Sequence, residues 1–313
     1  MAVPNTNLDQ ISAITNEYFM GGLPDLVHRK NPVLNRLHAK GTTPSSGDQI
    51  RIPLIYQVTQ DGAYRDYERG STDAEDQITA AQFPWKLYRQ HVTLSRPELL
   101  RNDGPEGIFK ILKAKRDAAA SALRSAMGDA LYVAASGDSV AGLNSLDNLL
   151  GDGTIPGSGD PTIAGGIDKA TYTWWRGSVN DYGAAVLATD LNTLWFDIVD
   201  GSEHPNLIIS DNANLAVYWA ILDGNKRFVN MKGDAGFTQM EFNGVPWVAD
   251  RHCPTDHVYM LDTEHLDLVS MRGENFRFDG FQKPTDQNVS VGWIYWMGNV
   301  VTNDPRKSGF FNN

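Results

Sequence analysis

Cysteine is almost absent from the chain, which has one, Cys253, among its 313 residues. A single cysteine cannot form a disulfide within the chain, and it excludes a zinc site built from four cysteines. Long hydrophobic runs are also missing, since no stretch of about 18 apolar residues could cross a bilayer as a helix. The first ten residues are polar and lack the basic and apolar segments of a secretory signal peptide. We therefore expect a protein that is made in the cytosol and has no membrane partner.

Basic residues are fewer than acidic ones, 27 against 38, which gives a net charge of -11 and a pI of about 5.0. A surface of this sign repels phosphate backbones and disfavours sequence-specific nucleic-acid binding. It is compatible with a container for packed DNA, because a container gains nothing by adhering to its contents. The basic spots at Lys113, Lys115 and Arg116, and at Arg306 and Lys307, are too small and scattered to predict a nucleic-acid footprint.

Catalytic motifs are missing as well. The chain contains no Gly-x-x-x-x-Gly-Lys-Ser/Thr phosphate loop and no Gly-x-Ser-x-Gly nucleophile elbow. Gly151-Asp152-Gly153 begins like a dinucleotide fingerprint, but Pro156 stands where a third glycine is needed and no strand precedes the motif. We therefore expect no enzyme activity, no cofactor and no catalytic residues.

One group of potential metal ligands lies in residues 250–257. It combines the carboxylate, imidazole and thiolate atoms that zinc accepts: Asp250, His252, Cys253, Asp256 and His257. The spacing matches no standard site, and Pro254 interrupts it. We interpret the segment as a polar surface loop with a half-buried cysteine and expect no metal.

Two further patterns leave a rival function open. Any fold would place some pair of the many carboxylates at a separation suited to a glycosidase. Trp174-Trp175 and the segment from Trp293 to Trp296 could form a platform for stacking sugars, although core packing or burial at a subunit interface is the stronger interpretation. A hydrolase or sugar-binding protein stays as an alternative, and it would need a pocket with converging carboxylates.

Hydrophobic residues make up 41% of the chain, enough for the core of one large domain or two smaller ones. Residues 1–45 are interrupted by glycines and prolines, so they would struggle to build a core of their own. Their apolar side chains are better used against another surface. We therefore interpret this segment as an arm.

A two-residue hydrophobic period predicts a strand at residues 50–58, where Pro53 favours an edge or bulged position. Residues 83–94 are the expected return strand, with a bulge between Leu87 and Val92 where the apolar parity changes. About 20 mostly polar residues lie between the two strands. Because a charged tip of this kind cannot pack into its own core cheaply, we predict a projecting β-hairpin that contacts another molecule.

Apolar residues recur at helical spacing over residues 102–136, after Asn102 or Asp103 as a cap and a proline in the first turn. A helix of about 30 residues would be about 45 Å long. Its apolar stripe is rich in alanine, so we expect it to lie flat along a sheet or a neighbouring subunit.

The second half of the chain alternates short strands with helices. We predict a buried strand at 207–209, a helix at 214–222 and a hairpin that turns at Asn243-Gly244. Further strands are expected at 258–261, 275–281 and 289–301. The predicted fold class is therefore mixed α+β, without an internal repeat.

The order of these parts resembles the major capsid proteins of tailed double-stranded DNA bacteriophages, which have the Hong Kong 97-like fold. Short phrases along the chain support the resemblance: Gly142-Leu143-Asn144-Ser145-Leu146, Gly165-Gly166-Ile167-Asp168, Thr173-Trp174-Trp175-Arg176, Phe242-Asn243-Gly244-Val245-Pro246, Val258-Tyr259-Met260-Leu261-Asp262-Thr263, Asn275-Phe276-Arg277-Phe278 and Trp296-Met297-Gly298-Asn299-Val300-Val301. Each phrase alone is structural and unspecific, and their shared order over nearly the whole chain carries the resemblance.

The resemblance implies a division into four parts. Residues 1–45 would be the N-terminal arm, and 46–96 the extended loop, a β-hairpin. Residues 97–179 would form the peripheral domain with its spine helix at 102–136. Residues 180–313 would form the axial domain, apart from a return strand at about 275–283 that belongs to the peripheral domain.

The resemblance also implies a structural virion protein that assembles with itself. Hexamers and pentamers would close into an icosahedral shell that encloses double-stranded DNA without reading its sequence, after assembly in the cytoplasm of the host bacterium. Separate scaffolding, portal and decoration proteins are the other expected partners. Subunit contacts are expected at the hairpin tip, from Arg65, Asp66, Tyr67, Glu68 and Arg69.

Two departures from the family pattern limit these expectations. No long charged helical segment precedes the arm, so we see no built-in scaffolding domain. The tip at residues 60–82 contains no lysine, so cross-linking between lysine and asparagine through the tip is not expected. An encapsulin-like compartment of the same fold and a tail-tube protein are the alternatives among structural proteins.

Overall fold

Helices and sheets alternate in the computed structural model, and the fold class is α+β as the sequence predicts. The described residues are 31–57, 63, 66, 76–101, 105–133, 137–153, 162–181, 188–222, 239–255, 257–285 and 287–312. Within these ranges, no helix is both long and apolar enough to cross a membrane.

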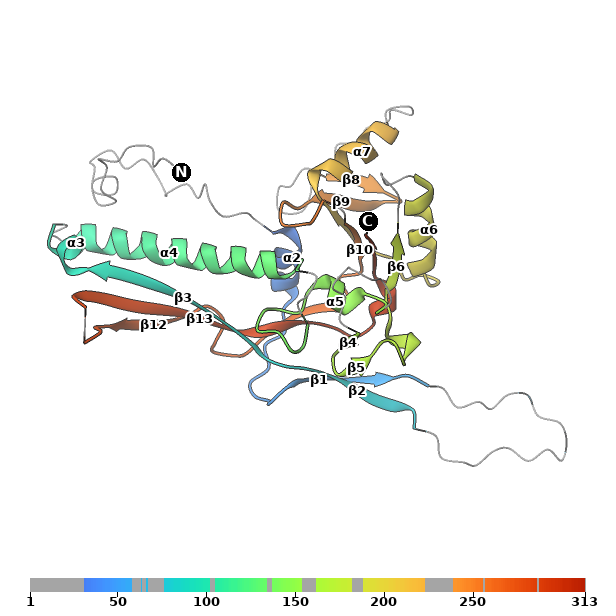
Figure 1. Cartoon of the computed structure of the whole chain (residues 1–313), viewed down its shortest axis with the longest axis horizontal. Helices are drawn as coiled ribbons and strands as arrows, with labels where there is room; N and C mark the ends of the chain where they lie inside the picture. Colours follow the sequence, from blue (N-terminus) through green and yellow to red (C-terminus); the bar gives the residue numbers. More distant parts are fainter. Residues whose placement is uncertain are drawn as a thin grey trace.

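A long, narrow sheet covered by one helix forms the extended half of the molecule (Figure 1). Its central strand, β13 (Val289–Thr302), pairs antiparallel with β3 (Lys86–Ser95) along one edge. Strands β11 (Leu266–Ser270) and β12 (Arg277–Gln282) follow one another along the opposite edge. Helix α4 (Pro105–Ala130) lies on one face of this sheet, and we call the helix and the sheet together the plate.

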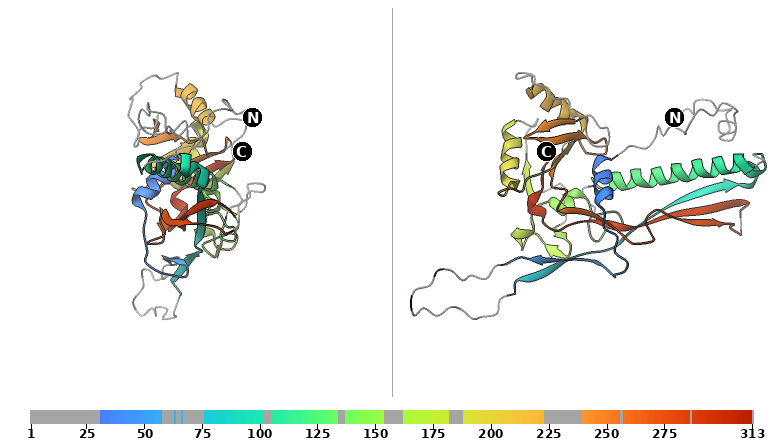
Figure 2. Two further views of the ribbon diagram at one scale, coloured as in Figure 1. Left: turned by 90° about the vertical axis from the view of Figure 1, so that its left-hand side faces the viewer. Right: turned by 180° about the vertical axis from the view of Figure 1, so that it is seen from behind.

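The alternation of buried and exposed side chains along the strands decides which face of the sheet the helix covers. On β3, Val92 and Leu94 are buried, whereas the odd-numbered residues point to solvent. The helix contributes Ala119, Leu123 and Met127 to the same core. The small alanine allows α4 to lie flat against the sheet, as the alanine-rich stripe predicts (Figure 2).

The helix is shorter than the predicted range of 102–136. A separate short helix, α3 (Arg96–Arg101), precedes it, and α4 ends at Ala130. The Tyr132 and Val133 amides then bond to carbonyls three residues back, which tightens the last turn. The hydrophobic period continues past this point because Leu131 and Tyr132 are also buried, so the sequence pattern overruns the true end.

The hairpin differs from its prediction. Strand β1 (Ile50–Ile55) pairs with β2 (Ile78–Phe83), so of the predicted return strand at 83–94 only Phe83 pairs with β1. The chain leaves the hairpin after Phe83 and enters β3, which continues into the plate. The predicted bulge in β3 is wrong, since Lys86–Ser95 pairs with β13 without interruption. Leu87 breaks the apolar parity because it faces solvent with 71% of its surface exposed.

The other half of the molecule is a lobe built on a six-stranded sheet of order β6-β14-β10-β7-β9-β8. Its strands are β6 (Ser178–Asp181), β7 (Leu207–Ser210), β8 (Gln239–Phe242), β9 (Val245–Ala249), β10 (Val258–Leu261) and β14 (Gly309–Asn312). The buried strand at 207–209, the Asn243-Gly244 turn and the strand at 258–261 are confirmed. Both turn residues have positive φ, as a two-residue hairpin turn requires.

Two helices cover one face of the lobe sheet. They are α6 (Ala188–Ile198) and α7 (Asn212–Leu222), which begins two residues before the predicted helix. They enclose a core around Leu194, Ile208 and Trp247. The opposite face joins the main core, which continues into the plate.

Short elements fill the junction between the plate and the lobe. They are α2 (Pro32–Lys40), α5 (Leu146–Leu150), the small hairpin β4 (Ile163–Ala164) with β5 (Ile167–Asp168), and two 3-10 turns, η1 (Thr173–Trp175) and η4 (Pro305–Lys307). Every residue of α5 is buried. The glycine- and proline-rich segment at residues 137–170 therefore contains a small buried helix that the sequence pattern does not reveal.

Candidate subunit-contact surfaces

The ribbon formed by β1 and β2 has apolar residues on both of its faces. On the inner face, Ile52 and Leu54 pack against the main core, and Tyr56 just beyond β1 stacks on Trp174 at 5.5 Å between ring centroids. On the outer face, Ile55 lies directly opposite Ile78. These two side chains are 78% and 72% exposed. A cross-strand pair of β-branched residues in solvent leaves its apolar surface without a partner in the described chain.

The base of the ribbon is held firmly by the junction. The Gln82 amide donates a hydrogen bond of 2.8 Å to the Gly165 carbonyl, and Phe83 is fully buried. Gly165 has a φ of +61°, and a side chain there would meet the Phe83 ring at 2.8 Å. The ribbon therefore projects in a fixed direction, away from the α3 end of the plate (Figure 1).

The predicted contact residues lie beyond the stem of this ribbon. Arg65, Tyr67, Glu68 and Arg69 are outside the described residues, and Asp66 is exposed. Their role as subunit contacts stays a prediction. Sequence reasoning missed Ile55 and Ile78, although Ile55 interrupts the polar set of the period-two pattern and could have been noticed.

The uncovered face of the plate carries aromatic rings paired with cations. His91 lies opposite Trp293 across the β3–β13 ladder, and the Arg89 guanidinium lies 5.4 Å from the Trp293 ring centroid. On the β12 side, Arg277 lies 5.6 Å from the Tyr295 centroid. Aromatic residues and arginine are enriched at the centres of protein interfaces. This face is therefore a second candidate contact surface.

A buried polar network holds the end of α4 against the lobe. The Tyr132 hydroxyl donates to Asp250 at 2.7 Å, and the Tyr259 hydroxyl donates to Asp147 at 2.7 Å. At the exposed edge of this network, the His252 ring contacts Asp129 of α4 at 2.6 Å. Burial raises the pKa of Asp250, although its hydrogen bonds from His252 and Tyr132 act in the opposite direction. The network joins the two halves of the molecule. Its buried polar groups would destabilise the fold if they lost their hydrogen-bond partners.

The potential metal ligands at 250–257 take part in this network. Cys253 is buried and not half-buried, and burial raises its thiol pKa well above the usual range. The His257 ring is in contact with the rings of both Tyr259 and Phe310. Asp256 lies outside the described residues. In the described part of the chain, no group of three or more histidine, cysteine or acidic side chains is placed to hold a metal ion.

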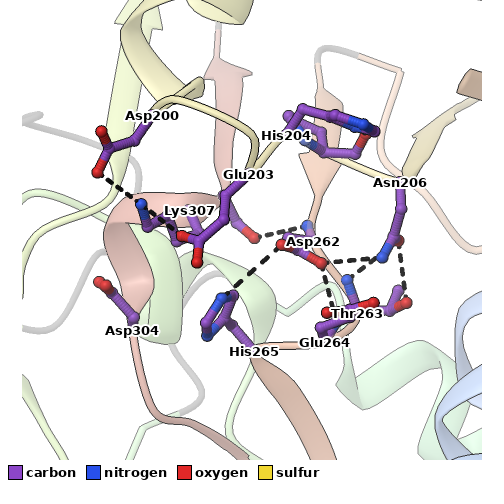
Figure 3. Close-up of polar contacts among 12 residues, drawn as sticks. Asp200, Glu203, His204, Asn206, Asp262, Thr263, Glu264, His265, Asp304 and Lys307 are labelled. Atoms are coloured by element: carbon purple, nitrogen blue, oxygen red, sulfur yellow. Dashed lines mark hydrogen bonds and ion pairs between the residues drawn. The ribbon is translucent and has the colours of Figure 1, made fainter.

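A second polar cluster holds the last turn of the chain in the lobe (Figure 3). Lys307 contacts Asp200 at 2.8 Å and Glu203 at 2.7 Å. Burial lowers the pKa of Lys307, but the hydrogen bonds to both carboxylates outweigh burial and raise it overall. In the same cluster, the Asn206 amide donates to Asp262 at 2.8 Å. These contacts fix the position from which β14 enters the sheet.

The tryptophans and carboxylates that a hydrolase or sugar-binding protein could use can be located in the described part of the chain. Trp175 and Trp296 are fully buried, and the Trp293 ring is partnered by Arg89. A cavity of about 470 Å³ lies between residues 42–52 and the ends of β11 and β13. Its lining contains a single carboxylate, Asp267, which pairs with Lys40 at 3.2 Å. Two opposed carboxylates, which glycoside hydrolysis requires, do not line this cavity.

Comparison with solved structures finds likeness over the whole length of the chain. The capsid protein of cyanophage A-1(L) superposes with a TM-score of 0.71 at 15% identity, covering 97% of this chain and 99% of that one. The capsid of an empty GTA particle gives a TM-score of 0.65 at 11% identity, covering 93% and 99%. The chain has the Hong Kong 97-like capsid fold.

This fold is shared with protein compartments. The SrpI encapsulin of Synechococcus elongatus superposes with a TM-score of 0.64 at 10% identity, covering all of this chain and 96% of that one. No protein-family model and no curated protein sequence matches the chain. At these identities the likeness establishes the Hong Kong 97-like fold, and the predicted order of hairpin, long helix and α/β lobe is confirmed in the described residues.

Proposed function

We propose that the chain is the major capsid subunit of a tailed double-stranded DNA bacteriophage. The observation that carries the proposal is the likeness to phage capsid proteins, which covers nearly all of both chains. Subunits would form hexamers and pentamers and close into an icosahedral shell around the genome. The role requires association and no catalysis.

In this proposal, the ribbon would be the extended loop, the plate the core of the peripheral domain and the lobe the axial domain. The ribbon would lie over an adjacent subunit, and the lobes would meet at the centre of each capsomer. The exposed isoleucine pair of the ribbon supports this arrangement. Burying each isoleucine would stabilise the contact by about 1.5–3 kcal/mol, before the entropy cost of association is subtracted.

The partners follow from the same proposal. A separate scaffold, a portal and decoration proteins would join the shell, and the virion would be the protein's final location after assembly in the host cytoplasm. Asp66 and its neighbours at the tip would fix the register through ion pairs more than they would add affinity.

The first test is negative-stain electron microscopy of the purified full chain, with light scattering for size. We expect closed shells, or rings of five and six, formed alone or with the cognate scaffold. A chain that stays monomeric with crowding agent, high salt and scaffold would contradict the proposal, and stacked rings would indicate a tail tube.

An encapsulin-like compartment is the second candidate, supported by the likeness to SrpI over the full chain. Particles purified from the native cell separate the two candidates. Double-stranded DNA inside them would support the capsid, and a co-purifying enzyme inside them would support the compartment.

A further inference from the structure

The ribbon is tied to the junction at both ends of its paired strands. At the base, the Gln82 amide donates a hydrogen bond to the carbonyl of Gly165, in the turn of the small hairpin β4–β5 (Figure 1). At the far end, the Tyr56 ring stacks on Trp174 of η1 with an angle of 23° between the ring planes. Because Gln82 lies opposite Arg51, about five residues of extended chain separate the two contacts, a stem of about 17 Å.

The outermost contact governs the angle at which the ribbon leaves the junction. A two-stranded ribbon is too weak to fix its own direction. Along the stem, Ile52 and Leu54 pack against the main core, and the Tyr56 amide then bonds to the Gln77 carbonyl at 3.1 Å. A lateral displacement of about 1 Å at Tyr56 would turn a stem of about 17 Å by about 3°. The direction of the ribbon is therefore sensitive to this one contact.

Trp174 is held by a braced turn at residues 168–176. The Asp168 carboxylate accepts hydrogen bonds from an amide and a hydroxyl within the turn, at 2.9 and 2.7 Å. The Arg176 guanidinium donates to two carbonyls of the same turn, at 2.6 and 3.0 Å. The neighbouring Trp175 is fully buried, and its indole N–H donates to a carbonyl of β4 at 2.9 Å. The turn therefore presents the Trp174 ring to the ribbon as a fixed surface.

The stacked rings are less enclosed than the base of the ribbon. Tyr56 and Trp174 are both half-buried, whereas Phe83 at the base is fully buried. Tyr172, whose ring lies 5.9 Å from that of Trp174, is 47% exposed. Offset stacking of aromatic rings favours one relative orientation beyond the area that it buries. The stack is therefore suited to hold a direction more than to stabilise the fold.

We propose that the stack of Tyr56 on Trp174 sets the angle of the ribbon and, through this angle, the curvature of the shell. The inference rests on the proposed capsid function, in which the ribbon reaches an adjacent subunit. Because each ribbon would join one subunit to the next, its angle to the junction would fix the angle between neighbouring subunits. Trp174 is thus a positioning residue, whereas Ile55 and Ile78 would supply the contact itself.

Distances within the unassembled subunit test the stack without any shell. Spin labels are attached at Ile78→Cys, at the far end of the stem, and at Asn192→Cys, an exposed position on α6. The natural Cys253 is buried with a raised thiol pKa, so it contributes little background labelling. Pulsed electron paramagnetic resonance then gives the distribution of distances between the labels, and circular dichroism shows that each variant is folded.

Tyr56→Ser removes the stack from the side of the ribbon, and Trp174→Leu removes it from the side of the junction. We expect each substitution to broaden the distribution of distances at least twofold. Tyr56→Phe keeps the ring and is the matched control, so it should give the distribution of the parent. Equal widths in the parent and in both disruptive variants would overturn the inference.

Particle size tests the consequence for curvature. Parent and variants, without the label sites, are assembled under the same conditions and measured by electron microscopy. We expect Tyr56→Ser and Trp174→Leu at least to double the spread of particle diameters, and Tyr56→Phe to give particles like those of the parent. Variant particles with the diameter and spread of the parent would overturn the inference, even if the spin labels report a broader distribution.

The outcomes separate this inference from the proposal on which it rests. If the parent forms no particles, the capsid proposal fails, while the spin labels still decide whether the stack fixes the ribbon. If the parent forms uniform particles and both disruptive variants match them, only the inference fails. If Tyr56→Ser abolishes particles and Trp174→Leu leaves them unchanged, Tyr56 contacts a neighbour directly, and this result would also overturn the inference.

Discussion

The ribbon and the lobe bury their apolar residues by different means. In the lobe, strand β14 places Phe310 in one core and Phe311 in the other, and both side chains are almost fully buried. In the ribbon, Ile55 and Ile78 stand in solvent although they belong to paired strands. The apolar residues of the lobe core are covered by the chain itself, whereas the isoleucine pair of the ribbon is left uncovered by the described residues. Stability and assembly should therefore respond to different substitutions.

The largest effect is expected in the lobe. Phe310→Ala should lower the free energy of unfolding by about 3–5 kcal/mol, because it opens a cavity in the main core. Denaturant unfolding followed by circular dichroism measures this. Phe196→Ala is the matched control, since the Phe196 ring is 73% exposed on α6, and it should change stability by no more than about 0.5 kcal/mol. Equal effects of the two substitutions would contradict the assignment of Phe310 to the core and of Phe196 to the surface.

The junction comes next. Tyr132→Phe removes the hydroxyl that donates to buried Asp250 and should cost about 1–3 kcal/mol. Tyr172→Phe, at an exposed tyrosine, serves as the control. Unfolding by urea at neutral pH measures both. A Tyr132→Phe variant as stable as the control would mean that the network does not hold the two halves together.

The carboxyl group of Asp250 should also make the free energy of unfolding depend on pH. Because the folded pKa of Asp250 is raised, the folded state holds this proton more tightly than the unfolded state does. Its contribution to stability is therefore present below the unfolded pKa of about 3.9 and is lost as pH rises through the folded value. Asp250→Asn removes this titration. The free energy of unfolding of the variant should therefore rise relative to that of the parent between pH 4 and pH 7. A constant difference would contradict the shift.

The smallest effect on stability, and the one that sharpens the comparison most, is expected in the ribbon. Ile55→Ser with Ile78→Ser should change the free energy of unfolding by less than about 0.5 kcal/mol, because both side chains are exposed. Assembly should nevertheless be lost, as seen by light scattering and electron microscopy. Arg51→Ser with Gln82→Ser, at a cross-strand pair on the same face, is the control. If the isoleucine variant forms normal shells, Ile55 and Ile78 are not needed for assembly.

A related deletion tests the tip together with the first three residues of β2. Removing residues 61–80, which takes out the tip together with Ile78, should leave a folded and soluble subunit that cannot assemble. Circular dichroism and electron microscopy measure the two properties. Intact particles from this variant would remove the role given to the whole hairpin.

Local patterns predicted much of this fold. The Asn243-Gly244 turn, the buried strand at 207–209 and the long helix depend on neighbours in sequence, and each was recognisable from spacing alone. The partner of β1 was misassigned because residues 78–94 contain two strands, and the pairing of Lys86 onwards with β13 joins segments some 200 residues apart in the chain. Periodicity reports which residues are apolar, and it does not report where a strand changes sheets.

The contact surfaces were harder to predict for a related reason. Charged residues at the tip attract attention in a sequence, whereas Ile55 looks like any core residue until the register places it opposite Ile78 on the outer face. Likewise, the buried helix α5 carries Asp147 and Asn148 at fully buried positions, which a hydrophobic pattern cannot anticipate. The exposure of Ile55 and the burial of α5 both depend on contacts with segments that are distant in the sequence.

The position of β14 has a consequence for synthesis. This strand follows every other strand of the lobe sheet in sequence, yet it lies inside that sheet, between β6 and β10. Because translation produces residues 309–312 after both neighbours, β6 and β10 stay unjoined until this late segment leaves the ribosome. We expect that copies terminated before Gly309 fail to complete the lobe, and that a growing shell admits only subunits in which β14 is in place.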